Sequence, residues 1–218
     1  MSGTTSRKIQ DEILVAERAL AEGRMFEAER TALAALEAAR SSNDFRSMAA
    51  IIPTLRTARG ARLEAALDAS RSVRHLEARP EEDDVVEPGC YLVQPPLVGA
   101  DARALRIAAF EQEVPVAVIC REPMTDLKLR PVVAIGRITV RARVLPAADD
   151  SNPDLDWLLA AMNEIGETAI ESVDTGTPVP KQVDALLDRL DSIPDHARLH
   201  DVLAEACLVA ASSEHQCG

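Results

Sequence analysis

The spacing of hydrophobic positions changes twice along the chain. Up to about residue 76, and again after residue 154, apolar side chains recur every three or four residues, which predicts amphipathic helices. Between them they form short continuous or alternating runs, the pattern of strands. We therefore divide the chain into an N-terminal helical region (1–79), an acidic linker (80–88), a small α/β unit (89–146) and a C-terminal helical region (147–218).

The α/β unit begins with a predicted strand–helix–strand segment. Residues 90–93 are apolar, and the strand ends before Pro95-Pro96 because proline cannot donate to a sheet ladder. Asp101 suits the N-cap of a helix from Ala102 to about Glu113. The continuous apolar run at 116–120 is typical of a strand buried on both faces, which favours parallel pairing with the first strand.

A hairpin is predicted to complete the sheet. Residues 132–135 and 138–144 flank Gly136-Arg137, a pair that suits a two-residue type II′ turn. Successive strand side chains point to opposite faces, so the second strand is expected to be apolar on one face and basic on the other. The apolar set is Ile138, Val140, Ala142 and Val144, and it alternates with Arg137, Thr139, Arg141 and Arg143.

The N-terminal region predicts two antiparallel helices and a longer helical stretch. Gly23 separates the amphipathic segments 9–22 and 26–40, and the short turn makes them antiparallel neighbours. From residue 44 to 76 the helical spacing continues through Pro53, which predicts either one kinked helix or two pieces. This stretch is the most basic of the chain, and we interpret its arginines as a solvated helix face: Arg56, Arg59, Arg62, Arg71 and Arg74.

One short motif in this region resembles a known family. Gly23-Arg24-Met25-Phe26-Glu27-Ala28, followed by Ala35-Leu36, is similar to the turn and second helix of a tetratricopeptide repeat (TPR). The resemblance covers one helical hairpin, about residues 9–42, with no second copy at the family's period of about 34 residues. It implies a protein-interaction surface on these helices.

Three helices are predicted after the second linker, which covers residues 146–153. They span about 154–173, a short segment ending near Ser192, and a last helix that Asp195 caps. The predicted fold class is therefore α+β, mostly helical. It has a small central four-stranded βαββ sheet, flanked by the N-terminal TPR-like helices and a C-terminal three-helix group.

Composition and charge narrow the possible partners. The chain of 218 residues is 47% hydrophobic and carries a net charge of −12. Such an acidic protein is a poor candidate for binding nucleic acid or anionic membranes, because both depend on Lys and Arg. No apolar run approaches the roughly 20 residues of a membrane helix, and the N-terminus lacks the apolar core of a signal peptide. We expect a cytoplasmic protein whose four cysteines are free thiols.

Candidate chemistry is sparse. The chain has no GxSxG, GxxxxGK[ST], GxGxxG or HExxH motif, so we expect no catalytic residue and no cofactor. His196 and His200 are four residues apart, and Cys207 follows on the same predicted helix. These three are candidate metal ligands, although histidines at an exposed helix edge are the simpler interpretation.

Two polar sets in the α/β unit are candidate binding sites. Gln94 and Arg121 follow the two parallel strands, and Asp101 lies at the nearby helix start, where free backbone amides favour an anion. Arg137, Arg141 and Arg143 form a basic stripe that either pairs with acidic parts of the same chain or docks a partner.

We therefore expect a cytoplasmic, non-catalytic protein–protein interaction or scaffold module with a protein partner. The alternative is a small-ligand or anion-binding regulatory domain that uses the strand ends of the α/β unit.

Overall fold

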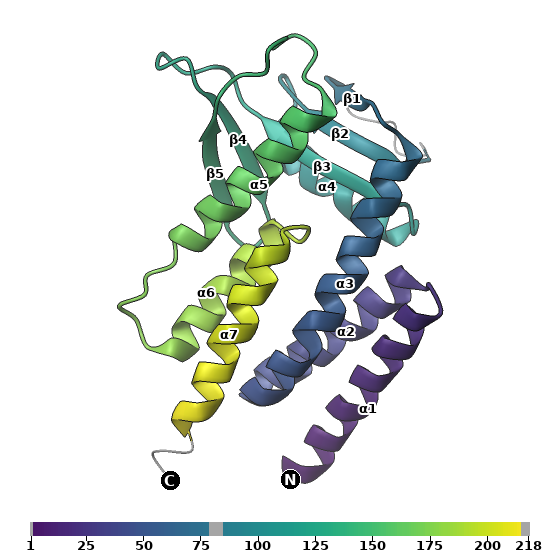
Figure 1. Cartoon of the computed structure of the whole chain (residues 1–218), viewed down its shortest axis with the longest axis vertical. Coiled ribbons are helices and arrows are strands. Elements are labelled where there is room, and N and C mark those ends of the chain that lie inside the picture. The colour runs from purple at the N-terminus through teal and green to yellow at the C-terminus, as the bar shows by residue number, and fades with distance from the viewer. Residues whose placement is uncertain (1, 79–84, 215–218) are drawn as a thin grey trace. The chain divides into compact units, whose positions relative to one another are not determined.

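The computed structural model describes residues 2–78 and 85–214, and it shows an α+β protein (Figure 1). Helices make up 59% of it, and the described residues form seven helices and one five-stranded mixed sheet, which confirms the predicted fold class. The elements follow in the order α1 (Ser2–Ala21), α2 (Met25–Ser41), α3 (Phe45–Ala69), β1 (Val73–Leu76), β2 (Gly89–Val93), α4 (Gly99–Glu111), β3 (Val116–Arg121), β4 (Arg130–Ile135), β5 (Thr139–Val144), α5 (Leu155–Glu171), α6 (Val179–Ser192) and α7 (Ala197–Glu214).

The chain forms two compact units, each assembled from segments that are separated in the sequence. Unit 1 comprises Met1–Ala61, Val173–Leu187 and Ala197–Gly218, and unit 2 comprises Arg62–Ser172 and Asp188–His196. Helices α3 and α6 therefore each contribute residues to both units.

In unit 1, α1 and α2 form the predicted antiparallel hairpin. Gly23 joins them with a φ of 75°, the left-handed conformation that glycine adopts without a steric penalty. Ala19, Ala28 and Ala58 are fully buried against one another, so small side chains allow α1, α2 and the first part of α3 to pack closely. The stretch after residue 44 is one helix that continues through Pro53 and Gly60.

Unit 2 is built on a sheet with the strand order β1-β2-β3-β4-β5. Strands β1, β2 and β3 pair in parallel, and β3, β4 and β5 pair antiparallel, which confirms the predicted crossover and hairpin. Figure 1 shows α4 and α5 on opposite sides of this sheet. On the α4 side, Val93, Cys120 and Val133 pack against Ala102 of that helix.

Strand β1 was not expected, because the helical pattern was extended to Leu76. Instead α3 ends at Ala69, and Val73–Leu76 pair in parallel with Cys90–Val93. Four residues cannot be stable as an isolated strand, so this strand depends on a partner distant in the sequence. The sheet consequently has five strands rather than four.

The linker predicted at 80–88 lies partly outside the described residues, which resume at Val85. Val86 packs into the core with Tyr91, Leu105 and Val116, and its backbone N–H donates to the Gln112 side chain at 3.1 Å. This part of the predicted linker therefore contributes to the core of unit 2.

The β4–β5 turn differs from the predicted two-residue turn. Ile135 lies opposite Thr139, so Gly136, Arg137 and Ile138 form the loop. Among the described glycines, positive φ angles occur only at Gly23 and Gly89, so Gly136 does not adopt the II′ conformation. Glycine is needed at position 136 for space, because an added Cβ would lie 2.5 Å from the backbone nitrogen of Ser192.

Candidate functional site

Gln94 and Arg121 lie side by side at the carboxyl ends of the parallel strands. The β2–β3 register pairs Val93 with Cys120, so the residues that follow them, Gln94 and Arg121, are also neighbours. The Arg121 Nε donates to Gln94 Oε1 at 2.7 Å, and Gln94 Nε2 donates to Glu77 at 2.5 Å. Both side chains are buried, with 7% of Arg121 and 6% of Gln94 exposed.

Asp150 completes this cluster from the segment that was predicted as the second linker. Its backbone carbonyl accepts from Arg121 Nη1 at 2.8 Å, and its carboxylate pairs with Arg130 and, at 3.5 Å, with Arg121. Burial, followed by the nearby Arg130 charge, lowers the pKa of Arg121, whereas Asp150 opposes that shift. Donors of Arg121 are therefore committed to groups of the same chain, and an anion would have to displace them.

Asp101 does not join this cluster. Helix α4 begins at Gly99, three residues before the predicted start, and Val98 is the N-cap. The Asp101 carboxylate accepts from the Val98 backbone N–H at 2.8 Å, so it caps the helix from the third position rather than from the N-cap. Since α4 packs on the side of Val93 and Cys120, the alternation of strand side chains directs Arg121 to the opposite face.

The basic stripe on β5 is partly paired within the chain. Arg137 lies 3.9 Å from Asp188, and Arg141 lies 3.1 Å from Glu122, yet 61% and 58% of these arginine side chains remain exposed. Arg143 is also exposed, and it forms no ion pair with any residue in the described ranges. The stripe thus makes weak internal contacts and keeps charge facing solvent.

The two candidate metal-binding histidines belong to different units and are both buried, contrary to the expectation of an exposed edge. His196 precedes α7 in unit 2, where its ring packs on Gly166 and lies 3.4 Å from the Glu167 carboxylate. Burial lowers the pKa of His196. His200 lies in unit 1 with its Nε2 3.3 Å from Arg59 Nη1.

Cys207 is a buried thiol of α7. Burial raises its pKa to about 12, so the thiolate that a metal would require is disfavoured near neutral pH. Cys90, Cys120 and Cys207 are free, as predicted, and Cys217 lies outside the described residues. Throughout residues 2–78 and 85–214, no group of three or more His, Cys, Asp or Glu side chains could hold a metal ion.

Two arginines that were interpreted as solvated are buried in α3. In unit 1, Arg59 donates to Glu29 at 2.8 Å, and only 7% and 4% of the two side chains are exposed. In unit 2, Arg62 donates to the Val116 carbonyl at 3.1 Å and pairs with Asp195 at 2.5 Å. Sequence reasoning missed Glu29 and Asp150, and it gave Asp195 the role of a helix cap rather than that of a partner for Arg62. The only signal was that α3 carries arginines within its apolar spacing.

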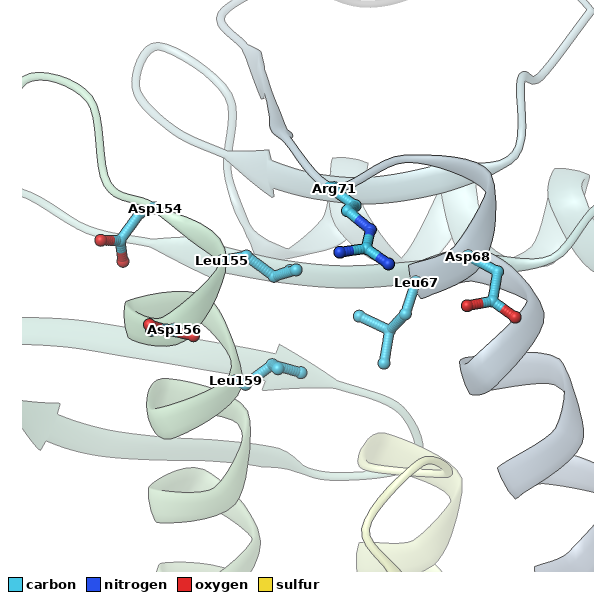
Figure 2. Close-up of a pocket in the computed structure, with 7 residues that line it drawn as sticks. All are labelled: Leu67, Asp68, Arg71, Asp154, Leu155, Asp156 and Leu159. Carbon is cyan, nitrogen blue, oxygen red and sulfur yellow. The ribbon is translucent and has the colours of Figure 1, made fainter.

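An open pocket of about 490 Å³ lies between the end of α3 and the start of α5 in unit 2. Figure 2 shows Leu155 and Leu159 of α5 pointing toward Leu67 and Arg71. Asp154, at the pocket's edge, caps α5 by accepting from the Trp157 backbone N–H at 2.9 Å. The pocket has an apolar surface with charged edges, which suits contact with another molecule. Its lining residues include no nucleophile paired with a base.

Helix α1 carries an exposed apolar pair on the face turned away from the hairpin's core. Ile13 and Ala16 are buried, whereas Leu14 is 59% and Val15 is 48% exposed. In the same unit, α7 has a second such pair, Leu208 at 55% and Val209 at 52%. Cys207 and Ala210, rather than Val209, lie on the buried face of α7.

Comparisons with protein-family models, curated proteins and solved structures found no match to the chain. Among the helices in the described parts of the chain, none has the length and apolar character needed to cross a membrane.

Proposed function

We propose that this protein is a non-catalytic protein–protein interaction module, and that the outward face of the TPR-like α1–α2 hairpin is its binding surface. The observation that carries the proposal is the exposed pair Leu14 and Val15 on α1. Large apolar residues that stand together on an exposed helix face lose contact with water when a partner covers them, which favours association.

The construction of the hairpin supports this role. Close packing of the short side chains of Ala19, Ala28 and Ala58 helps to hold α1 and α2 against α3. A rigid helix face loses little conformational entropy on binding, so more of the contact energy appears as affinity. Asp11 and Arg18 flank the apolar pair at helical spacing and provide a polar rim.

The cytoplasm is the location we propose with this function. The support is that Cys90, Cys120 and Cys207 are free thiols, the usual state of cysteine in a reducing compartment.

Site-specific photo-crosslinking tests the surface directly. A photoreactive residue is placed at position 11 or 18, beside the apolar pair, in the full chain within its native lysate. The same substitution at Glu205 on α7 samples the second exposed pair. We expect a discrete crosslinked protein from positions 11 and 18, and the Leu14→Gln/Val15→Gln variant is expected to reduce its yield by at least about ten-fold.

The matched control is Leu208→Gln/Val209→Gln, which removes an equally exposed apolar pair from α7. Circular dichroism and thermal melting establish that both double variants remain folded. Equal crosslinking by the wild type and the α1 variant, or equal losses in the two variants, would refute the assignment of the surface to α1.

A further inference from the structure

Strand β5 has an open backbone edge. Among the strands that the structure describes, it is the last of the sheet, and β4 is its one pairing partner. Its residue Arg143 lies opposite Pro131, whose carbonyl accepts from the Glu122 N–H at 2.9 Å and therefore faces β3. Arg143 and Pro131 are thus a non-hydrogen-bonded pair, and the backbone N–H and C=O of Arg143 point away from β4.

The same orientation recurs every second residue, so the backbone groups of Thr139 and Arg141 also point outward. No partner for these groups is found within residues 2–78 and 85–214. An exposed row of strand donors and acceptors is a template for another extended chain.

A groove lies beside the end of this edge. It has a volume of about 420 Å³. Its lining comes from the last two residues of β5 and the two that follow (143–146), and from Trp157, Ala160, Ala161 and Glu164 of α5. Leu145 is 76% exposed, and the Trp157 indole N–H donates to its backbone carbonyl at 2.9 Å. This hydrogen bond fixes the indole in place, so the groove presents an ordered apolar surface for a side chain of an added strand.

The arginines of β5 determine which kind of strand can pair with its open edge. If a second copy of this chain paired through β5, arginines of one copy would lie beside those of the other, and like charges on adjacent strands are destabilising. An acidic strand reverses that interaction, because its carboxylates would lie beside Arg141 and Arg143. We propose that β5 binds an extended acidic segment of another protein, which adds to the sheet as a sixth strand.

The geometry also defines the pattern of that segment. Residues directly opposite Arg141 and Arg143 point to the same face as these arginines, and the intervening residue points to the face that α5 covers. The recognised segment therefore alternates Asp or Glu with aliphatic residues, and one aliphatic side chain enters the groove. This surface lies on unit 2 and does not depend on the α1 face.

Fluorescence anisotropy with the full chain tests the proposal. The probe is a labelled eight-residue peptide in which Glu alternates with Val and Leu. A second peptide has Lys in place of Glu, and a third is N-methylated at the residues whose N–H groups would bond to β5. We expect saturable binding of the first peptide only, because methylation keeps the charge but removes the backbone donors.

Variants then locate the site. Arg143→Ala is expected to weaken binding by at least about ten-fold, since it removes a charge-assisted contact. Arg103→Ala, at an exposed arginine of α4, is the matched control and is expected to leave binding unchanged. Leu14→Gln/Val15→Gln is also expected to bind normally, so failure at β5 is distinct from failure of the α1 surface.

Three results would overturn the inference. They are equal binding of the methylated and unmethylated peptides, wild-type affinity in Arg143→Ala, and no binding of the acidic peptide at 1 mM or below, where even weak complexes are detected. Self-association of the chain can be measured by sedimentation. If the wild type self-associates and a charged residue at position 139 abolishes this, the edge would instead bind a second copy of the chain.

Discussion

The arginines buried in α3 and those exposed on β5 are used in opposite ways. Arg59 is enclosed with Glu29, and Arg62 with Asp195, each pair with fixed hydrogen bonds. Arg141 shares an exposed contact with Glu122, and Arg143 faces solvent. A buried guanidinium costs solvation energy that only a fixed partner repays, whereas an exposed one keeps its charge ready for an external partner. Stability should therefore depend on the first group, and recognition on the second.

The largest effect is expected from Arg59→Met. The substitution breaks the buried Arg59–Glu29 ion pair, and removing one partner of a buried pair costs on the order of 3–5 kcal/mol in the free energy of unfolding. Urea denaturation followed by circular dichroism measures the loss. The double variant Arg59→Met/Glu29→Leu removes both charges and should recover most of the stability. If it were as unstable as the single variant, lost packing rather than the broken ion pair would be the cause.

Arg121→Met is expected to have an intermediate effect, about 1–3 kcal/mol. The substitution removes the hydrogen bonds to Gln94 and to the Asp150 carbonyl. The Asp150 carboxylate, however, keeps Arg130 as a partner and is 28% exposed, so it is not stranded. Urea denaturation again gives the value, and a loss equal to that of Arg59→Met would show that the strand-end cluster is as strongly coupled as the α3 pair.

Substitutions on β5 are expected to change stability least. Arg141→Ala should cost about 0–1 kcal/mol, because the Arg141–Glu122 pair is partly exposed to water, and Arg143→Ala should stay within about 0.5 kcal/mol of the wild type. Thermal melting of both variants checks this. A large loss in either would assign the stripe a structural role and remove the contrast with α3.

The smallest expected effect is a difference in how the exposed and the buried arginines respond to salt. Raising the ionic strength from about 0.05 to 0.5 M shortens the distance over which exposed charges interact to a few ångströms. Enclosed ion pairs are affected much less. The small stability difference between wild type and Arg141→Ala should vanish at high salt, and the Arg59→Met difference should persist. Paired urea titrations at the two salt concentrations provide the comparison.

Elements with strong local patterns could be predicted from the sequence. The hairpin of α1 and α2, the β2–α4–β3 crossover and the alternation along β5 all follow from spacing within one short segment. Strand β1 could not be predicted in this way. Its four residues become a strand only through pairing with β2, and that interaction joins segments that are distant along the chain.

The polar networks were least predictable for the same reason. Arg59 meets Glu29 across helices, and Arg62 meets Asp195 from more than one hundred residues away. Helical spacing placed both arginines correctly on α3, but a long side chain at that spacing is consistent with either solvent or a buried partner. Asp101 illustrates a smaller error, because one carboxylate can cap a helix from the N-cap or from the third position, and only the backbone distinguishes them.

The interleaved chain also constrains how the protein can be made on a ribosome. Unit 1 requires α7, whose His200 lies beside Arg59, but α7 is synthesised only after residues 62–196. Of these residues only Val173–Leu187 belong to unit 1, and the others form unit 2. At ~5–20 residues per second, the first three helices wait on the order of ten seconds for it. During that interval the surface of unit 1 that α7 will cover remains open, so nascent chains need protection there. Unit 2 has all its segments first, because its last residue, His196, is translated just before α7 begins.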